Sequence, residues 1–107
     1  MFVINGVAWK VKRVPPDYPL LQTPKGNYAI GVCDRKSKLI CINNQLRRGL
    51  IKEVLCHEIT HAAMFSYNIQ LTYDEEELIA NLIAKYGHEI VSITDVIFKK
   101  LQRGYLL

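Results

Sequence analysis

The sequence has few cysteines, and no two of them lie close enough to form a CxxC pair. The three are Cys33, Cys41 and Cys56. An odd number without close pairs argues against a disulfide framework and fits a reducing compartment. We therefore expect a cytoplasmic protein in which the cysteines are mainly small core residues.

Long apolar runs are missing as well. No run of about eighteen consecutive apolar residues occurs, so we expect no membrane-spanning helix. The N-terminus lacks a basic start followed by an apolar run, and this argues against a secretory signal peptide. The sequence thus predicts a protein without a membrane partner.

A large excess of one charge is also absent. Lys plus Arg number 14 and Asp plus Glu number 10, giving a net charge of +4. The basic residues form short scattered clusters, and aromatic residues are not interleaved with them. We interpret these clusters as solvated loops and strand edges. A nucleic-acid partner is the less favoured alternative.

The bulk composition is that of a folded globular protein. Half of the 107 residues are hydrophobic and 22% are charged. This balance and length predict a single domain spanning residues 1–107. A core of this size is thin, so a bound metal ion would add usefully to stability.

The first part of the chain has the periodicity of strands. Residues 2–14 read as one half-buried strand kinked at Asn5-Gly6, with Val7, Trp9 and Val11 on the buried face. Residues 28–33 and 38–42 are β-prone runs separated by a turn, which predicts an antiparallel hairpin. The proline-rich segment 15–27 between them predicts a surface loop of undetermined role.

The second part of the chain has helical periodicity. A helix is expected from residue 45 to about residue 67, with Asn43-Asn44 as its cap. Thr72 and Glu75 form a capping-box signature for a second helix, which Gly87 ends or bends. The helical spacing then continues to the C-terminus. The predicted fold class is α+β, a small antiparallel sheet followed by these helices.

The first long helix carries the sequence His57-Glu58-Ile59-Thr60-His61, an HExxH motif. Two histidines four residues apart lie on one helical face, so their rings can converge on one ion. Zn²⁺ favours such nitrogen ligands, and a catalytic zinc site keeps one position for water. Zinc lowers the pKa of that water to roughly 7, and the adjacent Glu58 carboxylate is placed to take its proton.

The second helix supplies a candidate third ligand. Glu77 and Asn81 are four residues apart and share a helical face. We expect Glu77 to bind the metal and Asn81 to hydrogen-bond a ligand, such as the free ring nitrogen of a histidine. Glu76 is the alternative ligand, whereas the acidic residues before it fit a helix N-terminus.

Three further side chains were considered for this site. Tyr67 and Tyr73 lie in the connection between the two helices and are candidates to stabilise an oxyanion or donate a proton, although packing of that connection explains them equally simply. His88 lies about three turns (~16 Å) beyond Glu77 on a continuous helix, too far to bind the same ion. We expect His88 to be a surface histidine.

The HExxH motif followed by Glu77-Leu78-Ile79-Ala80-Asn81-Leu82-Ile83-Ala84 resembles the ImmA/IrrE type of metallopeptidase domain. The layout is similar to minimal gluzincins, and Gly31-Val32-Cys33-Asp34 is similar to short phage-encoded members. The resemblance covers about residues 28 to 90. It implies a zincin-like fold, His57, His61 and Glu77 as zinc ligands, and Glu58 as catalytic base.

The resulting functional hypothesis is a zinc metalloendopeptidase acting on a protein or peptide substrate. The resemblance implies a cytosolic enzyme that cleaves a regulatory protein such as a repressor. The open edge of the hairpin is suited to binding an extended substrate as an added strand. The alternative is a catalytically silent module with the zincin fold that binds a protein partner.

Overall fold

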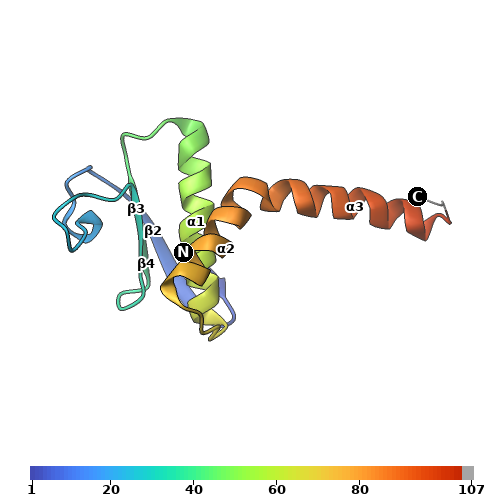
Figure 1. The fold of residues 1–107 in the computed structure, drawn as a ribbon, viewed down its shortest axis with the longest axis horizontal. Helices are drawn as coiled ribbons and strands as arrows, with labels where there is room; N and C mark the ends of the chain where they lie inside the picture. The colour runs from blue at the N-terminus through green and yellow to red at the C-terminus, as the bar shows by residue number, and fades with distance from the viewer. Residues whose placement is uncertain (105–107) are drawn as a thin grey trace.

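The computed structural model describes residues 1–104 and combines a four-stranded sheet with three helices (Figure 1). The strands pair in the order β1-β2-β4-β3. Their bounds are β1 Phe2–Ile4, β2 Val7–Val14, β3 Gly31–Asp34 and β4 Leu39–Asn43. The helices that follow are α1 Arg48–Ser66, α2 Tyr73–Leu82 and α3 His88–Gln102. The predicted α+β class is confirmed.

The first two strands form a hairpin, so the prediction of one kinked strand was wrong. Asn5 and Gly6 both have positive φ, 47° and 80°. Asn-Gly is the preferred pair for a two-residue turn of this kind, which reverses the chain. β1 ends opposite Trp9, so Val11 lies beyond the cover of β1 and is 43% exposed, whereas Trp9 is buried.

The sheet is mixed, which corrects the prediction of a purely antiparallel sheet. The hairpin of β3 and β4 is antiparallel as predicted, although β3 starts only at Gly31. β2 and β4 pair in parallel, from Lys10 with Leu39 to Val14 with Asn43. The reason is the long connection 15–30, which carries the chain past one strand position that β4 then fills.

The two faces of the sheet bury different cores. α1 covers one face, where Trp9 and Ile40 pack with Val54 and Ala62 of the helix. On the other face, the proline-rich loop contributes the short 3-10 turn η1, Pro19–Leu21, to a second cluster. Its buried members are Val14, Leu21 and Cys41. The loop therefore covers the face of the sheet opposite the helices (Figure 1).

Helix α1 begins later than predicted, and the expected cap was wrong. Arg47 is the N-cap residue and makes no side-chain capping hydrogen bond. Asn43 instead accepts a hydrogen bond from the backbone N–H of Gln45 at 2.7 Å, which forms a turn directly after β4. At the other end of the helix, Trp9 Nε1 donates to Ser66 Oγ at 2.9 Å and ties α1 to the sheet.

Helix α2 begins at the predicted capping box. Glu75 N donates to Thr72 Oγ1 at 3.2 Å, and the Thr72 backbone N–H donates to Glu75 Oε1 at 2.9 Å. At Ile83–Gly87 the helix widens into a π-helical stretch, η2, and then continues as α3. Gly87 thus lies at a change in helical form rather than at an end.

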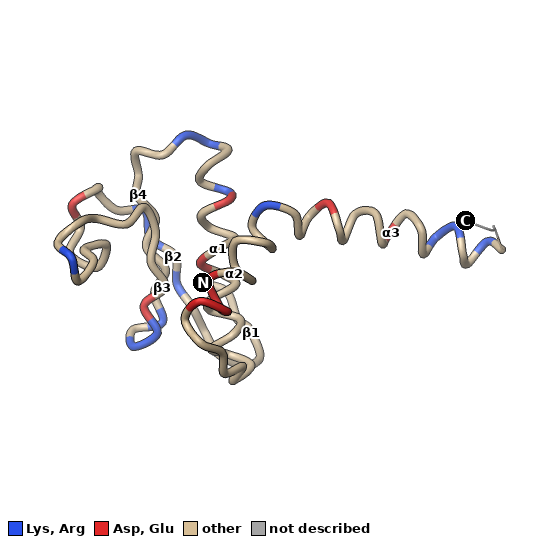
Figure 2. Tube along the Cα trace, in the orientation of Figure 1, with Lys and Arg blue, Asp and Glu red and all other residues tan. Residues whose placement is uncertain are grey.

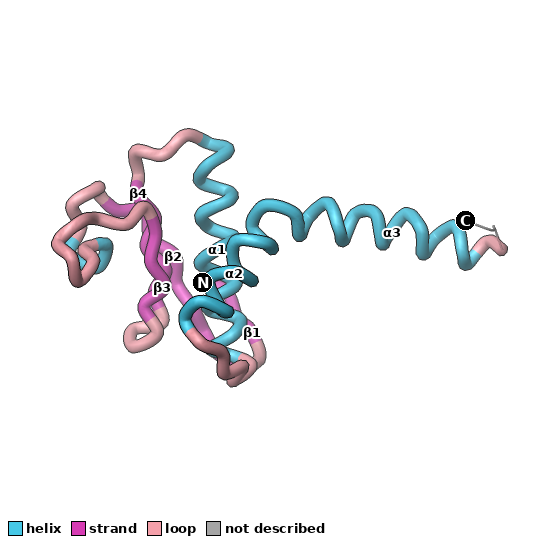
Figure 3. The backbone as a smooth tube through the Cα atoms, viewed as in Figure 1, coloured by secondary structure: helices cyan, strands magenta, loops and turns pink. Residues whose placement is uncertain are grey.

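Helix α3 extends away from the rest of the molecule (Figure 3), whose overall dimensions are 56 × 31 × 28 Å. None of its residues is buried. Within residues 1–104, no helix combines the length and apolar character needed to cross a membrane.

Candidate metal centre

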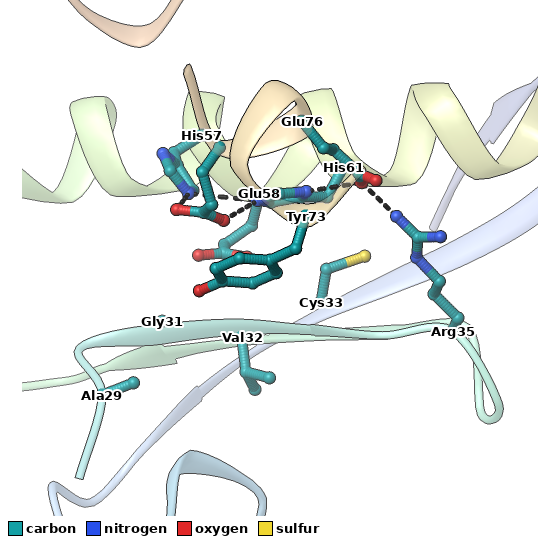
Figure 4. Close-up of a pocket in the computed structure, with 11 residues that line it drawn as sticks. Ala29, Gly31, Val32, Cys33, Arg35, His57, Glu58, His61, Tyr73 and Glu76 are labelled. Carbon is teal, nitrogen blue, oxygen red and sulfur yellow. Dashed lines mark hydrogen bonds and ion pairs between the residues drawn. The ribbon is translucent and has the colours of Figure 1, made fainter. Parts of the chain in front are cut away.

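A pocket of about 540 Å³ opens between α1, α2 and the edge strand β3 (Figure 4). His57, Glu58 and His61 enter it from α1 because their spacing places them on the side of the helix that faces α2 and β3. Glu76 and Glu77 enter it from the first turns of α2. The HExxH helix and the glutamate helix therefore meet as the sequence predicted.

Three ligand atoms converge in this pocket. His57 Nε2 lies 3.1 Å from His61 Nε2, and Glu77 carboxylate oxygens lie 2.8 Å from His61 Nε2 and 3.5 Å from His57 Nε2. For a tetrahedral zinc ion with bonds of about 2.0–2.1 Å, neighbouring ligand atoms are about 3.4 Å apart. The donor types and their separations fit one metal ion held by His57, His61 and Glu77.

Glu76 determines which nitrogen of His61 is free to bind a metal. A Glu76 carboxylate oxygen lies 2.7 Å from His61 Nδ1, so Nδ1 carries the proton and Nε2 presents its lone pair to the metal position. The same carboxylate is paired with the Arg35 guanidinium from the β3–β4 turn. Glu76, the alternative third ligand in the sequence, is therefore placed behind His61 while Glu77 faces the metal position.

Arg35 was not identified from the sequence as a site residue, because it lies in a basic turn that resembles any solvated loop. Its guanidinium also lies 5.7 Å from the centre of the Phe65 ring, which helps to fix its orientation. No local pattern relates Arg35 to Glu76, since they are separated by 41 positions and meet only in the folded chain.

Glu58 lies between α1 and β3 with little exposure to solvent. Burial raises the pKa of its carboxyl group. The neighbouring His57 and His61 lower this pKa in part, and the negative charge of Glu77 raises it. A carboxyl group with a raised pKa is suited to accepting a proton and releasing it again near neutral pH.

Gly31 allows β3 to lie directly over Glu58. A Cβ atom at this position would be 2.5 Å from Val54 Cγ1 and 3.2 Å from Glu58 Oε2. Any larger residue would therefore push the strand away from the helix. The sequence analysis did not identify Gly31 as important, because the requirement comes from the distance between two elements.

Cys33 lies on the same face of β3 and lines the pocket (Figure 4). Burial raises the pKa of its thiol to about 12, and the nearby Glu58 carboxylate acts in the same direction. The thiol is therefore protonated near neutral pH. Cys41 is opposite Val32 in the register and packs on the other face of the sheet, so the two cysteines do not face each other.

The remaining predicted residues fall at different distances from the centre. Asn81 lines an adjoining hollow of about 450 Å³ together with His57 and Glu58, but no hydrogen bond of the described chain joins it to a histidine. Tyr73 lines the main pocket, with its ring in front of Glu58 (Figure 4). Tyr67 is the C-cap residue of α1, outside the lining of this pocket.

His88 lies apart from the metal group, as expected. It is exposed and lines a separate hollow with Cys56 and Ile83. The described residues therefore bring two of the three histidines together and leave the third outside the centre.

The edge of β3 beside this centre is open. Asn43 N donates to Ile30 O at 3.0 Å, which fixes the alternation of hydrogen bonds along the hairpin. By that alternation, the backbone N–H and C=O groups of Gly31 and Cys33 point away from β4. They form an unpaired edge beside the pocket, since β3 is the last strand of the sheet.

Comparison with protein families agrees with this arrangement. The model of the Peptidase_M78 family, described as the IrrE N-terminal-like domain, matches residues 20–91. No curated protein and no solved structure matched the chain. The matched segment contains β3, β4, α1, α2 and every residue of the metal group. The chain therefore belongs to the Peptidase_M78 family of IrrE N-terminal-like domains.

Proposed function

We propose that this protein is a zinc-dependent metalloendopeptidase that cleaves a cytosolic regulatory protein. The observation that carries the proposal is the convergence of His57, His61 and Glu77 beside the buried carboxylate of Glu58. The open edge of β3 supports a peptide as the substrate class. The likeness to ImmA/IrrE domains supports a regulatory protein, such as a repressor, as the source of that peptide.

His57, His61 and Glu77 would hold the zinc ion. Two imidazoles and one carboxylate are a common ligand set of catalytic zinc sites, and a bound zinc ion supplies Lewis acidity toward a carbonyl and toward water. Glu76 keeps the proton of His61 on Nδ1, and Arg35 holds Glu76 in place. This outer pair supports the orientation of one ligand and leaves Glu77 free for the metal.

Glu58 acts as the general base. Its carboxylate accepts a proton from the attacking water and then passes that proton to the amine of the leaving peptide. Burial keeps the carboxyl pKa raised, so the group returns the proton more readily than an exposed glutamate would. Tyr73, which lines the same pocket, is proposed to donate a hydrogen bond to the carbonyl oxygen as negative charge develops on it.

The substrate lies extended along β3. The free backbone groups of Gly31 and Cys33 pair with the peptide as an added strand, which aligns the scissile bond with the metal position. The adjoining hollow of about 450 Å³ is lined by apolar side chains including Ile30, Leu50 and Val54. We propose that it accepts an apolar side chain next to the cleaved bond.

The test begins with the metal content of purified protein by elemental analysis. We expect about one zinc ion per chain. His61→Ala and Glu77→Ala should each lose or weaken binding. Absence of zinc even after reconstitution would overturn the proposal.

Activity is then measured on a mixture of quenched fluorescent peptides. Glu58→Gln should keep the metal but reduce the cleavage rate by about 10²–10⁴-fold. A zinc-loaded wild-type protein that cleaves no peptide but binds a protein partner equally well with Gln at position 58 would instead identify a catalytically silent regulatory module.

A further inference from the structure

Helix α3 carries a continuous row of apolar side chains that no residue of the described chain covers. Ile90, Ile93, Ile97 and Leu101 follow one another at helical spacing along one face. Val91, Val96 and Phe98 flank this row. We call these seven residues the α3 stripe; each is between 40% and 59% exposed.

The α3 stripe is made of residues that favour a helix poorly unless they are packed. Six of the eight residues from 90 to 97 are β-branched. Such side chains lose rotamer freedom in a helix, and an isolated helix of about 15 residues is marginal in water even with a favourable sequence. The packing of an apolar face supplies most of the stability of a helix of this kind, so α3 requires a surface against which to pack.

The size of the stripe matches what a protein dimer buries. Seven half-exposed apolar residues present roughly 600–700 Å² per chain, close to the roughly 800 Å² per partner of a standard interface. Monomeric proteins rarely expose a contiguous apolar patch larger than a few hundred Å². Two copies of the stripe placed face to face would remove this surface from water.

The charges of α3 are arranged for pairing in opposite directions (Figure 2). Acidic residues Glu89 and Asp95 lie toward the body of the protein, and basic residues Lys99 and Lys100 lie toward the far end. Glu89 and Lys100 are eleven residues apart, about three helical turns, so they lie on the same edge of the stripe. In an antiparallel pair each Glu89 meets the Lys100 of the other copy, whereas a parallel pair brings the like charges together.

We propose that α3 is the interface through which two copies of this chain form an antiparallel dimer. The α3 stripe of each copy packs on the same stripe of the other, with the two bodies at opposite ends of the helix pair. A lipid surface is the weaker fit, because Glu89 and Asp95 interrupt the basic polar face that an anionic membrane favours. The metal group and its pocket contain no α3 residue, so both pockets stay open in the dimer.

The first test is the mass of the full chain in solution, measured by light scattering or sedimentation equilibrium across a concentration series. We expect twice the 12.3 kDa of one chain. The double substitution Ile93→Glu and Ile97→Glu places charges at the centre of the stripe and should give the mass of one chain. Ser92→Glu is the matched control, because it adds a charge on the opposite, polar side of α3 and should leave the dimer intact.

Circular dichroism of the same samples separates dissociation from unfolding. Helix content of the wild type should rise with protein concentration as α3 pairs, and that of the double variant should not. The double variant should still bind zinc as the wild type does, since α3 lies outside the metal group.

A charge exchange tests the direction of pairing. Glu89→Lys and Lys100→Glu should each weaken the dimer several-fold, and the two together should restore it. Failure of the combined variant to recover would overturn the antiparallel arrangement. A wild-type chain that stays monomeric throughout the series, or one that is monomeric and binds vesicles containing anionic lipid, would overturn the dimer itself.

Discussion

Helices α1 and α3 are both predicted clearly by sequence periodicity, yet they are used in opposite ways. α1 lies between the sheet and α2 and buries polar residues, among them Glu58 and Thr60. α3 buries nothing and leaves its apolar row in contact with water. The difference teaches that periodicity predicts a helix, whereas the topology of the chain decides whether anything covers it. A buried polar group on one helix and an exposed apolar face on the other both indicate function rather than packing.

The largest expected effect tests whether the buried polar groups around α1 support metal binding. Glu76→Ala should weaken zinc binding by about 10–100-fold, because His61 loses the partner that fixes its Nδ1 proton. The zinc dissociation constant is measured by competition with a chelator of known affinity.

Asp74→Ala is the control, since this acidic residue lies in the same helical turn but outside the pocket. Equal zinc affinity in both variants would show that Glu76 does not act through His61. Arg35→Gln should give a smaller loss than Glu76→Ala, because Arg35 contacts the histidine only through Glu76.

The second effect tests how closely the sheet and α1 approach each other. Gly31→Ala should destabilise the protein by about 1–3 kcal/mol, because the added Cβ overlaps Val54 and Glu58. Gly49→Ala in α1 is the matched control, since its Cβ would meet nothing within 4 Å and alanine favours a helix. It should stabilise the protein by about 0.5–1 kcal/mol. Urea unfolding of the two variants should therefore shift in opposite directions.

The smallest effect concerns the cost of keeping Glu58 ionised inside the protein. Burial raises its pKa in the folded state, so the ionised carboxylate destabilises the fold as pH rises above the ordinary value of 4.5. Metal-free Glu58→Gln should accordingly melt about 2–5 °C higher than the wild type at pH 7. The difference should vanish at pH values well below 4.5, where the wild-type carboxyl is protonated in both states. A lower melting temperature at pH 7 would contradict this interpretation.

The geometry of the metal group could be predicted because it follows from local spacing. His57 and His61 share a helical face at any tertiary arrangement, and the capping box at Thr72 fixes where the helix bearing Glu77 begins. The neighbours of these residues could not be predicted in the same way. Arg35 and Gly31 reach the site from the hairpin, and their contacts depend on how closely two elements pack.

The direction of the central strand pair was beyond prediction for a related reason. A long irregular connection such as residues 15–30 permits either neighbour, and no local pattern indicates that β4 pairs with β2 in parallel. The asparagines after β4 show the same limit, since the types of residue that cap helices also form turns. Asn43 forms a turn here because the helix starts several residues later.

The π-helical stretch Ile83–Gly87 connects the metal-binding part of the chain to the α3 stripe without an intervening loop. A π-helical turn holds about one residue more than an α-helical turn. Deleting a single residue here would restore a regular helix and rotate everything beyond it by about 100° relative to Glu77. The angle between the cleft and the apolar row is thus encoded in a residue count, and a one-codon deletion would reorient one relative to the other while leaving both surfaces unchanged in composition.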